Sequence, residues 1–330
     1  MRNYKMDNIR FVLIFLVVFG HVMIRGLGGI TFEIYNVIYS FHMPAFIFIT
    51  GYFASFKPKK ILLSLLWPYL LMQILVFIFR YYALNQTKNP FSLIKPEYTL
   101  WYLLISALYY LLIPLIKTNN NKKKIVVMLL SLALSLIAGY VDKLGYELTL
   151  ARFFCFMPFF VCGFYLRNTS FSENFSLSFK KAKRWFIPFT VAFVVFAEAV
   201  ILNTPKLTNE TLHGAFSYGY SGIEWYHRLF LILTAFSIIV LLFNFIPDKK
   251  IKFVSNIGKN TFPIYITHGI LVQLLRYYGV LVFPLFWHII AVFFVTLILL
   301  VALGNDYVGN FFSTILTGNW ILKLKHGKEA

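Results

Sequence analysis

The stretch "DNIRFVLIFLVVFGHV", residues 7–22, decides the fold of this chain. It is apolar almost throughout, with Arg10 near one end and His21 near the other, and the run is long enough to cross a bilayer as a helix. Ionisable side chains are costly in hydrocarbon and usually face a bundle interior or a water-filled cavity. The stretch therefore predicts a membrane-spanning helix whose two polar positions have a function.

The composition extends this prediction to the whole chain. Of 330 residues, 59% are hydrophobic and only 13% are charged, with a mean hydropathy of +0.73, whereas a soluble domain has roughly 25% charged residues. We expect an all-α, polytopic integral membrane protein with about ten transmembrane helices. The first run lacks the cleavage site of a signal peptide and is expected to be retained. The apolar runs lie at 9–25, 34–55, 61–83, 98–116, 125–141, 150–167, 185–203, 225–246, 261–280 and 284–303.

The net charge of +19 is distributed in a way that predicts topology. If the N-terminus is cytoplasmic, 21 lysines and arginines lie in the inner segments and 7 in the outer ones. Cytoplasmic loops carry such an excess, so we expect both termini in the cytoplasm. The same charge favours contact with anionic lipid of the inner leaflet, and no nucleic-acid partner is needed to explain it.

The chain is expected to form one membrane-embedded domain over residues 1–330, because no Gly/Ser-rich or Pro-rich linker and no long soluble stretch divides it. The absence of an internal repeat disfavours an inverted-repeat transporter. The outer segment 204–224 is rich in Gly, Ser and aromatic residues; it either contacts a polar ligand such as a sugar or only connects two helices. Cys155 and Cys162 share one apolar run and are interpreted as core residues, and no metal site is expected.

Arg10 and His21 fall on one stripe of the first helix. They are eleven residues apart, which in a helix is a rotation of about 20° from the same face and a rise of roughly 16 Å. Asp7 lies one turn below Arg10, where it can pair with the guanidinium. This arrangement suits acyl-coenzyme A, with its phosphates at the cytoplasmic mouth and its thioester beside a base or nucleophile. The alternative is that Arg10 only snorkels to the interface and His21 bonds a neighbouring helix.

Five stretches carry a family resemblance. They are Arg10 and His21 spaced R-x10-H, "FHMPAFIFITGYF" (41–53), "LWYLL" (100–104), "RFFCFMPFFVCGFYLR" (152–167) and "IGKNTFPIYITHGI" (257–270). In this order they resemble the membrane acyltransferase-three family of bacteria, and look closest to the fucose 4-O-acetylase-like and capsular polysaccharide O-acetyltransferases. The resemblance implies transfer of an acetyl group from cytoplasmic acetyl-coenzyme A to a hydroxyl of a cell-surface sugar or polysaccharide at the plasma membrane. It also implies His21 as the catalytic imidazole, a base or an acyl carrier, with Arg10 as its partner.

The resemblance also implies roles for other charged positions, on weaker grounds. Lys59 and Lys60, with Lys57, lie where relatives carry a basic cluster before the third helix, which could bind the phosphates of the coenzyme or only set topology. Arg152 begins the sixth run from its outer side and, unless it snorkels to the interface, is expected to contact the acceptor or an inner polar partner.

The remaining substrate-binding candidates are aromatic and polar. Trp101 fits the family segment, although a tryptophan of the membrane interface is the simpler interpretation. Thr261, Tyr265 and His268 fall at i, i+4 and i+7 of the ninth run and form a polar stripe that should face the bundle interior. The stripe either lines the path of the acceptor or bonds between helices.

Two more polar positions lie inside apolar runs. His42 and Pro44 suggest a break in the second helix, and Glu198 stands alone in the seventh run without an obvious partner.

Two rival classes of function stay open at this point. A transporter or flippase for lipid-linked sugars would also use intramembrane Arg, His and Glu, and an accessory protein of polysaccharide assembly would need no chemistry. Several relatives carry a C-terminal esterase-like domain, whereas this chain ends about 27 residues after its tenth run, so we expect it to acylate its acceptor directly or through a separate protein. The acceptor sugar, the carbon acylated and the oligomeric state do not follow from these residues.

Overall fold

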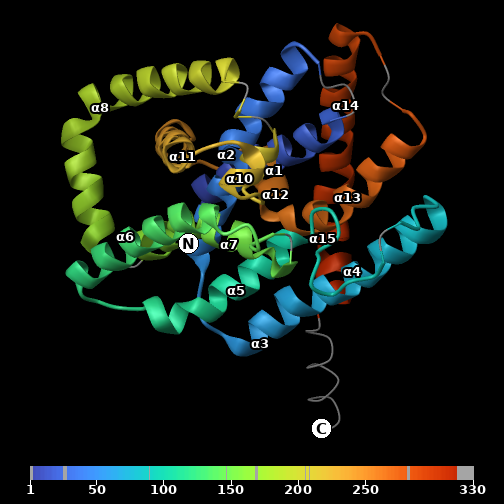
Figure 1. The fold of residues 1–330 in the computed structure, drawn as a ribbon, viewed down its shortest axis with the longest axis horizontal. Helices are drawn as coiled ribbons and strands as arrows, with labels where there is room; N and C mark the ends of the chain where they lie inside the picture. The colour runs from blue at the N-terminus through green and yellow to red at the C-terminus, as the bar shows by residue number, and fades with distance from the viewer. Residues whose placement is uncertain are drawn as a thin grey trace, which may run out of the picture. The chain divides into compact units, whose positions relative to one another are not determined.

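The computed structural model describes residues 3–24, 28–88, 90–145, 147–167, 170–204, 206–207, 209–280 and 283–317, and for 170–185, 209–210 and 313 no side chain is described. Within these residues every regular element is a helix (Figure 1). The prediction of an all-α fold is confirmed.

Eight helical stretches are long and apolar enough to cross a membrane, among the residues described. Two further helices that match predicted runs, α5 (Trp101–Ile116) and α13 (Thr261–Tyr277), are shorter. Each of the ten predicted runs is therefore helical, while the number of crossings and the side of the termini stay predictions. The eight stretches are α1 (Tyr4–Met23), α2 (Ile30–Phe53), Pro58–Ala83 (α3 Pro58–Ile61, η2 Leu62–Leu66, α4 Trp67–Ile78, η3 Phe79–Ala83), Asn121–Tyr140 (α6 Asn121–Ile137, η4 Ala138–Tyr140), Glu147–Arg167 (η5 Glu147–Thr149, α7 Leu150–Arg167), Phe186–Asn203 of α8 (Ser170–Asn203), α11 (Trp225–Phe245) and α14 (Leu285–Gly304).

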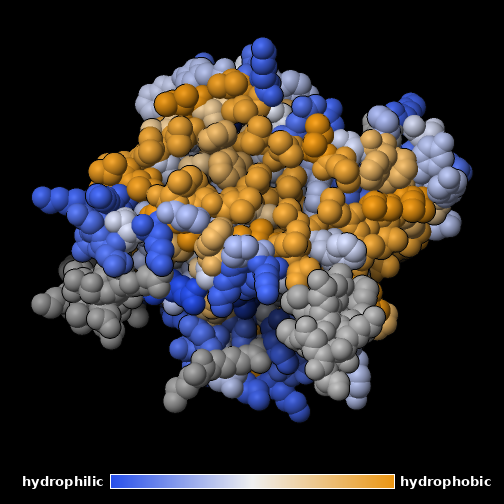
Figure 2. All heavy atoms as spheres, turned by 90° about the horizontal axis from the view of Figure 1, so that it is seen from below, coloured by the Kyte–Doolittle hydropathy of each residue, from blue (hydrophilic) through white to orange (hydrophobic). Residues whose placement is uncertain are grey.

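Large apolar side chains stay exposed along these helices. Leu115 is 83% exposed, Phe189 80% and Trp287 60%. Figure 2 shows one face of the molecule, on which hydrophobic residues cover a broad area and hydrophilic ones gather beside it. Soluble monomers rarely expose apolar surface on this scale, so these helices suit a lipid environment.

The chain divides into two compact units, each built from segments distant in sequence. The first unit holds residues 1–31, 56–107 and 248–330, and the second holds 32–55 and 108–247. Each unit is described by itself below, and the prediction of a single domain over the whole chain stays a prediction.

In the first unit α1 is enclosed by α12 (Lys252–Lys259), α13 and α14, and it is apolar on nearly all sides as a buried helix must be. Close approach to α12 depends on Gly258, where a Cβ would overlap the carbonyl oxygen of Asp7. Ser255 of α12 donates to Asn8 Oδ1 at 2.8 Å. The helix α15 (Asp306–Leu316) completes this unit. These contacts hold α1, and with it the positions of Arg10 and His21.

In the second unit α2 and α7 approach through glycines. A Cβ on Gly51 would overlap the carbonyl oxygen of Phe160, and one on Gly163 would overlap that of Phe48. Small residues at such contacts let backbones meet where burial of apolar area between helices gives little driving force. The expected break in the second helix is absent, because α2 continues through Pro44.

The helix α8 differs from the predicted seventh run. It begins at Ser170, so a segment expected to be a cytoplasmic loop is helical, and Figure 1 shows that the helix bends sharply. Pro188 lies inside it, and an internal proline removes a backbone hydrogen bond and kinks a helix. Two short helices follow, α9 (Asn209–Leu212) and α10 (Tyr218–Ser221), before α11.

Candidate active site

His21 lies in the last turn of α1, where two residues from other segments hold it. Its ring Nδ1 is 3.2 Å from the hydroxyl of Tyr98. Its main-chain carbonyl accepts a hydrogen bond of 2.7 Å from Nη2 of Arg276, near the end of α13. The last four carbonyls of a helix have no partner within the helix, so Arg276 satisfies one of them and anchors the backbone of His21.

Tyr98 belongs to the loop before α5, and its surroundings keep its hydroxyl protonated. Burial raises the pKa of Tyr98 to about 12, against the opposing effects of the nearby charge and hydrogen bond of Arg276. The guanidinium carbon of Arg276 is 5.3 Å from the centre of the Tyr98 ring. Tyr98 has a φ of 41°, in the left-handed region that residues other than glycine rarely adopt. A Cβ on Gly269 would come within 3.0 Å of the Tyr98 ring, so glycine there lets α13 pack against this loop.

His268 of α13 lies beside His21. Its side chain is fully buried, and the two imidazole centres are 5.4 Å apart. Its Nδ1 donates to the carbonyl of Ile264 at 3.0 Å, whereas its Nε2 is buried and has no hydrogen-bond partner among the residues that the structure describes. Tyr265, one turn earlier, has its ring centre 6.0 Å from that of His268 and donates its hydroxyl to the carbonyl of Thr99. Two members of the polar stripe predicted for this helix, Tyr265 and His268, therefore face the interior of the first unit, where His268 lies beside His21.

Arg10 does not reach this cluster. Its Nη1 is 3.7 Å from Asp7 Oδ1, as the spacing predicts, and its side chain is 28% exposed. Both Arg10 and His21 lie on the single helix α1, which places them roughly 16 Å apart along the axis. The pair is therefore suited to the two ends of a long ligand rather than to one reacting centre.

Three other predicted residues belong to the first unit. Lys59 and Lys60 are exposed on the short helix α3. Trp101 begins α5 and packs edge-on against Tyr102, at 6.3 Å between ring centres, and Tyr102 packs in turn against Tyr265 at 5.2 Å. The rings of Tyr102 and Tyr265 thus lie between Trp101 and the imidazole of His268.

Arg152 belongs to the second unit, where it holds the segment between α9 and α10. It is 9% exposed, and its Nε donates to the main-chain carbonyl of His213 at 3.1 Å. His213 Nε2 lies 3.1 Å from the hydroxyl of Tyr35. Burial, and then the charges of Arg152 and His42, lower the pKa of His213 to about 4, so its ring is neutral at physiological pH. The contact of Arg152 with an acceptor stays a prediction.

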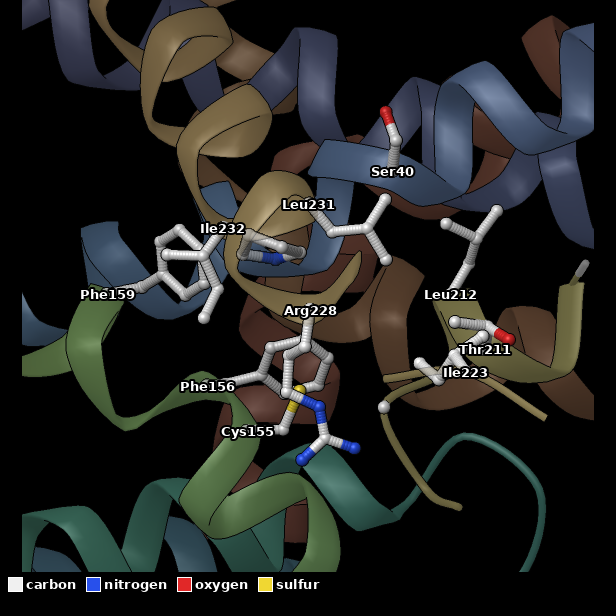
Figure 3. Close-up of a pocket in the computed structure, with 12 residues that line it drawn as sticks. Ser40, Cys155, Phe156, Phe159, Thr211, Leu212, Ile223, Arg228, Leu231 and Ile232 are labelled. Carbon is white, nitrogen blue, oxygen red and sulfur yellow. The ribbon is translucent and has the colours of Figure 1, made fainter. Parts of the chain in front are cut away.

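Arg228 holds the residues just before α10, beside a small cavity (Figure 3). Its guanidinium donates to the carbonyls of Ser135 and Phe216, each at 3.0 Å, and lies 4.5 Å from the centre of the Tyr218 ring. In Figure 3 it points toward Cys155, which also lines the cavity. A volume of about 30 Å³ suits water but excludes a sugar ring.

Further polar groups of the second unit form no metal site. Glu198 Oε1 accepts a hydrogen bond of 2.8 Å from Ser40, and Cys155 and Cys162 are both free. In the part of the chain that the structure describes, no three His, Cys, Asp or Glu side chains gather as metal ligands would.

The sequence did not predict a role in the site for Tyr98 or Arg276. Arg276 counted only as a charge of an outer segment, and Tyr98 stands in "KPEYTL" without a periodic pattern around it. Their roles depend on contacts across 77 and 255 residues of chain, and no local motif marks such pairs.

Comparison with known proteins matches residues 3–304 to the acyltransferase domain of the acyltransferase-three family. Neither the comparison with curated proteins nor that with solved structures gave a match. The family match covers nearly the whole chain, including R-x10-H on α1 and His268 on α13. With its eight candidate spans, this multi-pass membrane protein belongs to the acyltransferase-three family of membrane acyltransferases.

Proposed function

We propose that this protein transfers an acyl group, most simply acetyl, from cytoplasmic acyl-coenzyme A to a hydroxyl of a cell-surface sugar or polysaccharide. The observation that carries the proposal is the His21 ring, held by Tyr98 beside the His268 ring. This function matches that of the fucose 4-O-acetylase-like and capsular polysaccharide O-acetyltransferases, which the motifs resemble. The location would then be the plasma membrane of a bacterium.

The reaction needs a group that takes the proton of the hydroxyl while its oxygen attacks the thioester carbon. An imidazole suits this task because its proton exchange falls near physiological pH. The resemblance implies His21, as the base or as a transient carrier of the acyl group. When the C–S bond breaks, the thiolate recovers the proton and leaves as coenzyme A.

Arg10 supports the donor in this proposal. A cation near the cytoplasmic end of α1 can bind a phosphate of the coenzyme, and the exposed Lys59 and Lys60 can add to this charge. A helical rise of roughly 16 Å between Arg10 and His21 matches a ligand with phosphates at one end and a thioester at the other.

The test is restoration of esters in cells. A strain without this protein should lose acetyl esters of its surface polysaccharide, measured by NMR of the purified polymer. The wild-type protein should restore them and His21→Ala should not, although it reaches the membrane at the same level. Restoration by His21→Ala would refute the assignment, and movement of a lipid-linked sugar without an acyl donor would favour the flippase instead.

A further inference from the structure

One ring nitrogen of His268 makes a hydrogen bond, and the other makes none among the residues described. A carbonyl can only accept a hydrogen bond, so the contact with Ile264 requires the proton of the neutral ring to be on Nδ1. Its Nε2 then carries a lone pair, and this atom is buried without a hydrogen-bond partner among the residues described. A buried acceptor without a partner is unfavourable, because it has lost its hydrogen bond to water. The site therefore favours a ligand that presents an O–H or N–H to Nε2.

The ring proton of His21 is on the other nitrogen, Nε2, and its Nδ1 accepts a hydrogen bond. Arg276, a cation, hydrogen-bonds to the side chain of Tyr98 and lies over its ring. A phenol oxygen that accepts from a cation is a stronger donor through its own O–H. The Tyr98 proton is thereby directed to Nδ1 of His21, at 3.2 Å, and the neutral His21 ring carries its proton on Nε2.

We propose that His268 is a second catalytic residue, whose Nε2 takes the proton from the acceptor hydroxyl while the Nε2–H of His21 donates to the thioester oxygen. This inference rests on the proposed function and moves one role within it, that of the proton acceptor, from His21 to His268. The ring centres of His21 and His268 are 5.4 Å apart, so the donor, Nε2 of His21, and the acceptor, Nε2 of His268, belong to neighbouring side chains. A base and an oxyanion donor are both needed in acyl transfer.

The step balances without another reactant. The hydroxyl oxygen forms a bond to the thioester carbonyl carbon, and its proton passes to Nε2 of His268. The negative charge that develops on the carbonyl oxygen is stabilised by His21 Nε2–H. The C–S bond then breaks, and the thiolate takes the proton from the His268 imidazolium, which gives the ester, coenzyme A and a neutral ring.

Two substitutions test the roles of the two ring nitrogens of His268 one at a time. His268→Asn keeps a donor for the Ile264 carbonyl and removes Nε2, whereas His268→Gln places a non-basic amide oxygen near the position of Nε2. Thr267→Val is the matched control, because Thr267 also bonds to the carbonyl four residues before it on α13, that of Pro263. The full-length protein in nanodiscs would be assayed with radiolabelled acetyl-coenzyme A and the chemically de-O-acetylated surface polysaccharide of the source strain.

We expect kcat to fall about a hundredfold or more in both His268 variants, the usual contribution of a general base. KM for acetyl-coenzyme A should stay within about threefold, since the base acts in the transition state, and Thr267→Val should resemble wild type. Added imidazole should restore turnover to His268→Ala. Wild-type kcat in either the Asn or the Gln variant, or a loss that imidazole does not restore, would overturn this inference alone. No transfer by the wild-type protein would instead overturn the proposed function.

Discussion

At the scale of single residues, Tyr98 tests how His21 is held. Tyr98→Phe removes the hydroxyl 3.2 Å from His21 Nδ1 and leaves the ring beneath Arg276. We expect kcat to fall about tenfold, because a lost hydrogen bond of about 1.4 kcal/mol has that effect on a rate. Turnover of acetyl-coenzyme A by purified protein measures this. Tyr277→Phe, at an exposed tyrosine, serves as the control, and equal kcat in the two variants would contradict the role of Tyr98.

Arg10 is expected to act on binding of the donor rather than on chemistry. Arg10→Ala removes the cation near the N-terminal end of α1 and should raise KM for acetyl-coenzyme A by roughly 10- to 100-fold, the effect of losing a charged hydrogen bond. Arg10→Lys should retain part of the affinity because it keeps the charge but not the planar fork. Lys122→Ala, at an exposed lysine of α6, is the control. An unchanged KM in Arg10→Ala would rule out this contact.

His213 predicts a pH dependence of stability. Its pKa is lowered to about 4 in the folded protein, from 6.5, so between these values the unfolded chain binds more protons than the folded one. The stability is complete above pH 6.5 and is lost as the pH falls toward 4, by up to about 3 kcal/mol. Thermal unfolding of the wild-type protein and of His213→Gln at pH 7.5 and 5 measures the difference. The variant should lose less on acidification, and an equal loss would exclude His213 as its source.

At the scale of helices, the contact between α2 and α7 depends on Gly51. A Cβ at this position would overlap the main-chain oxygen of Phe160, so Gly51→Ala must displace one helix. We expect a lower melting temperature, from a destabilisation of about 1–3 kcal/mol typical of overpacking. Gly145→Ala is the control, because a Cβ there meets nothing within 4 Å. Equal melting temperatures of the two variants would show that the helices do not meet at this glycine.

At the scale of the whole molecule, the distribution of lysine and arginine predicts which loops face the cytoplasm. Lys122 lies in the first turn of the stretch that α6 and η4 form, and Lys143 lies just beyond its other end; both are exposed. In intact cells an impermeant maleimide should label Lys143→Cys and spare Lys122→Cys, because basic segments stay inside. The wild-type protein, with its free Cys155 and Cys162, measures the background labelling. The reverse labelling would invert the predicted topology.

Much about this protein follows from the sequence alone, because the relevant physics is local. Hydropathy along the chain determined the membrane class, and the ten predicted runs are all helical, since a backbone in lipid must satisfy its own hydrogen bonds. The spacing of Arg10 and His21 likewise followed from helical periodicity. Only the tertiary structure decided what surrounds His21. Tyr98, His268 and Arg276 reach it from the loop before α5 and from α13, and packing between distant segments, which no local period encodes, brings them together.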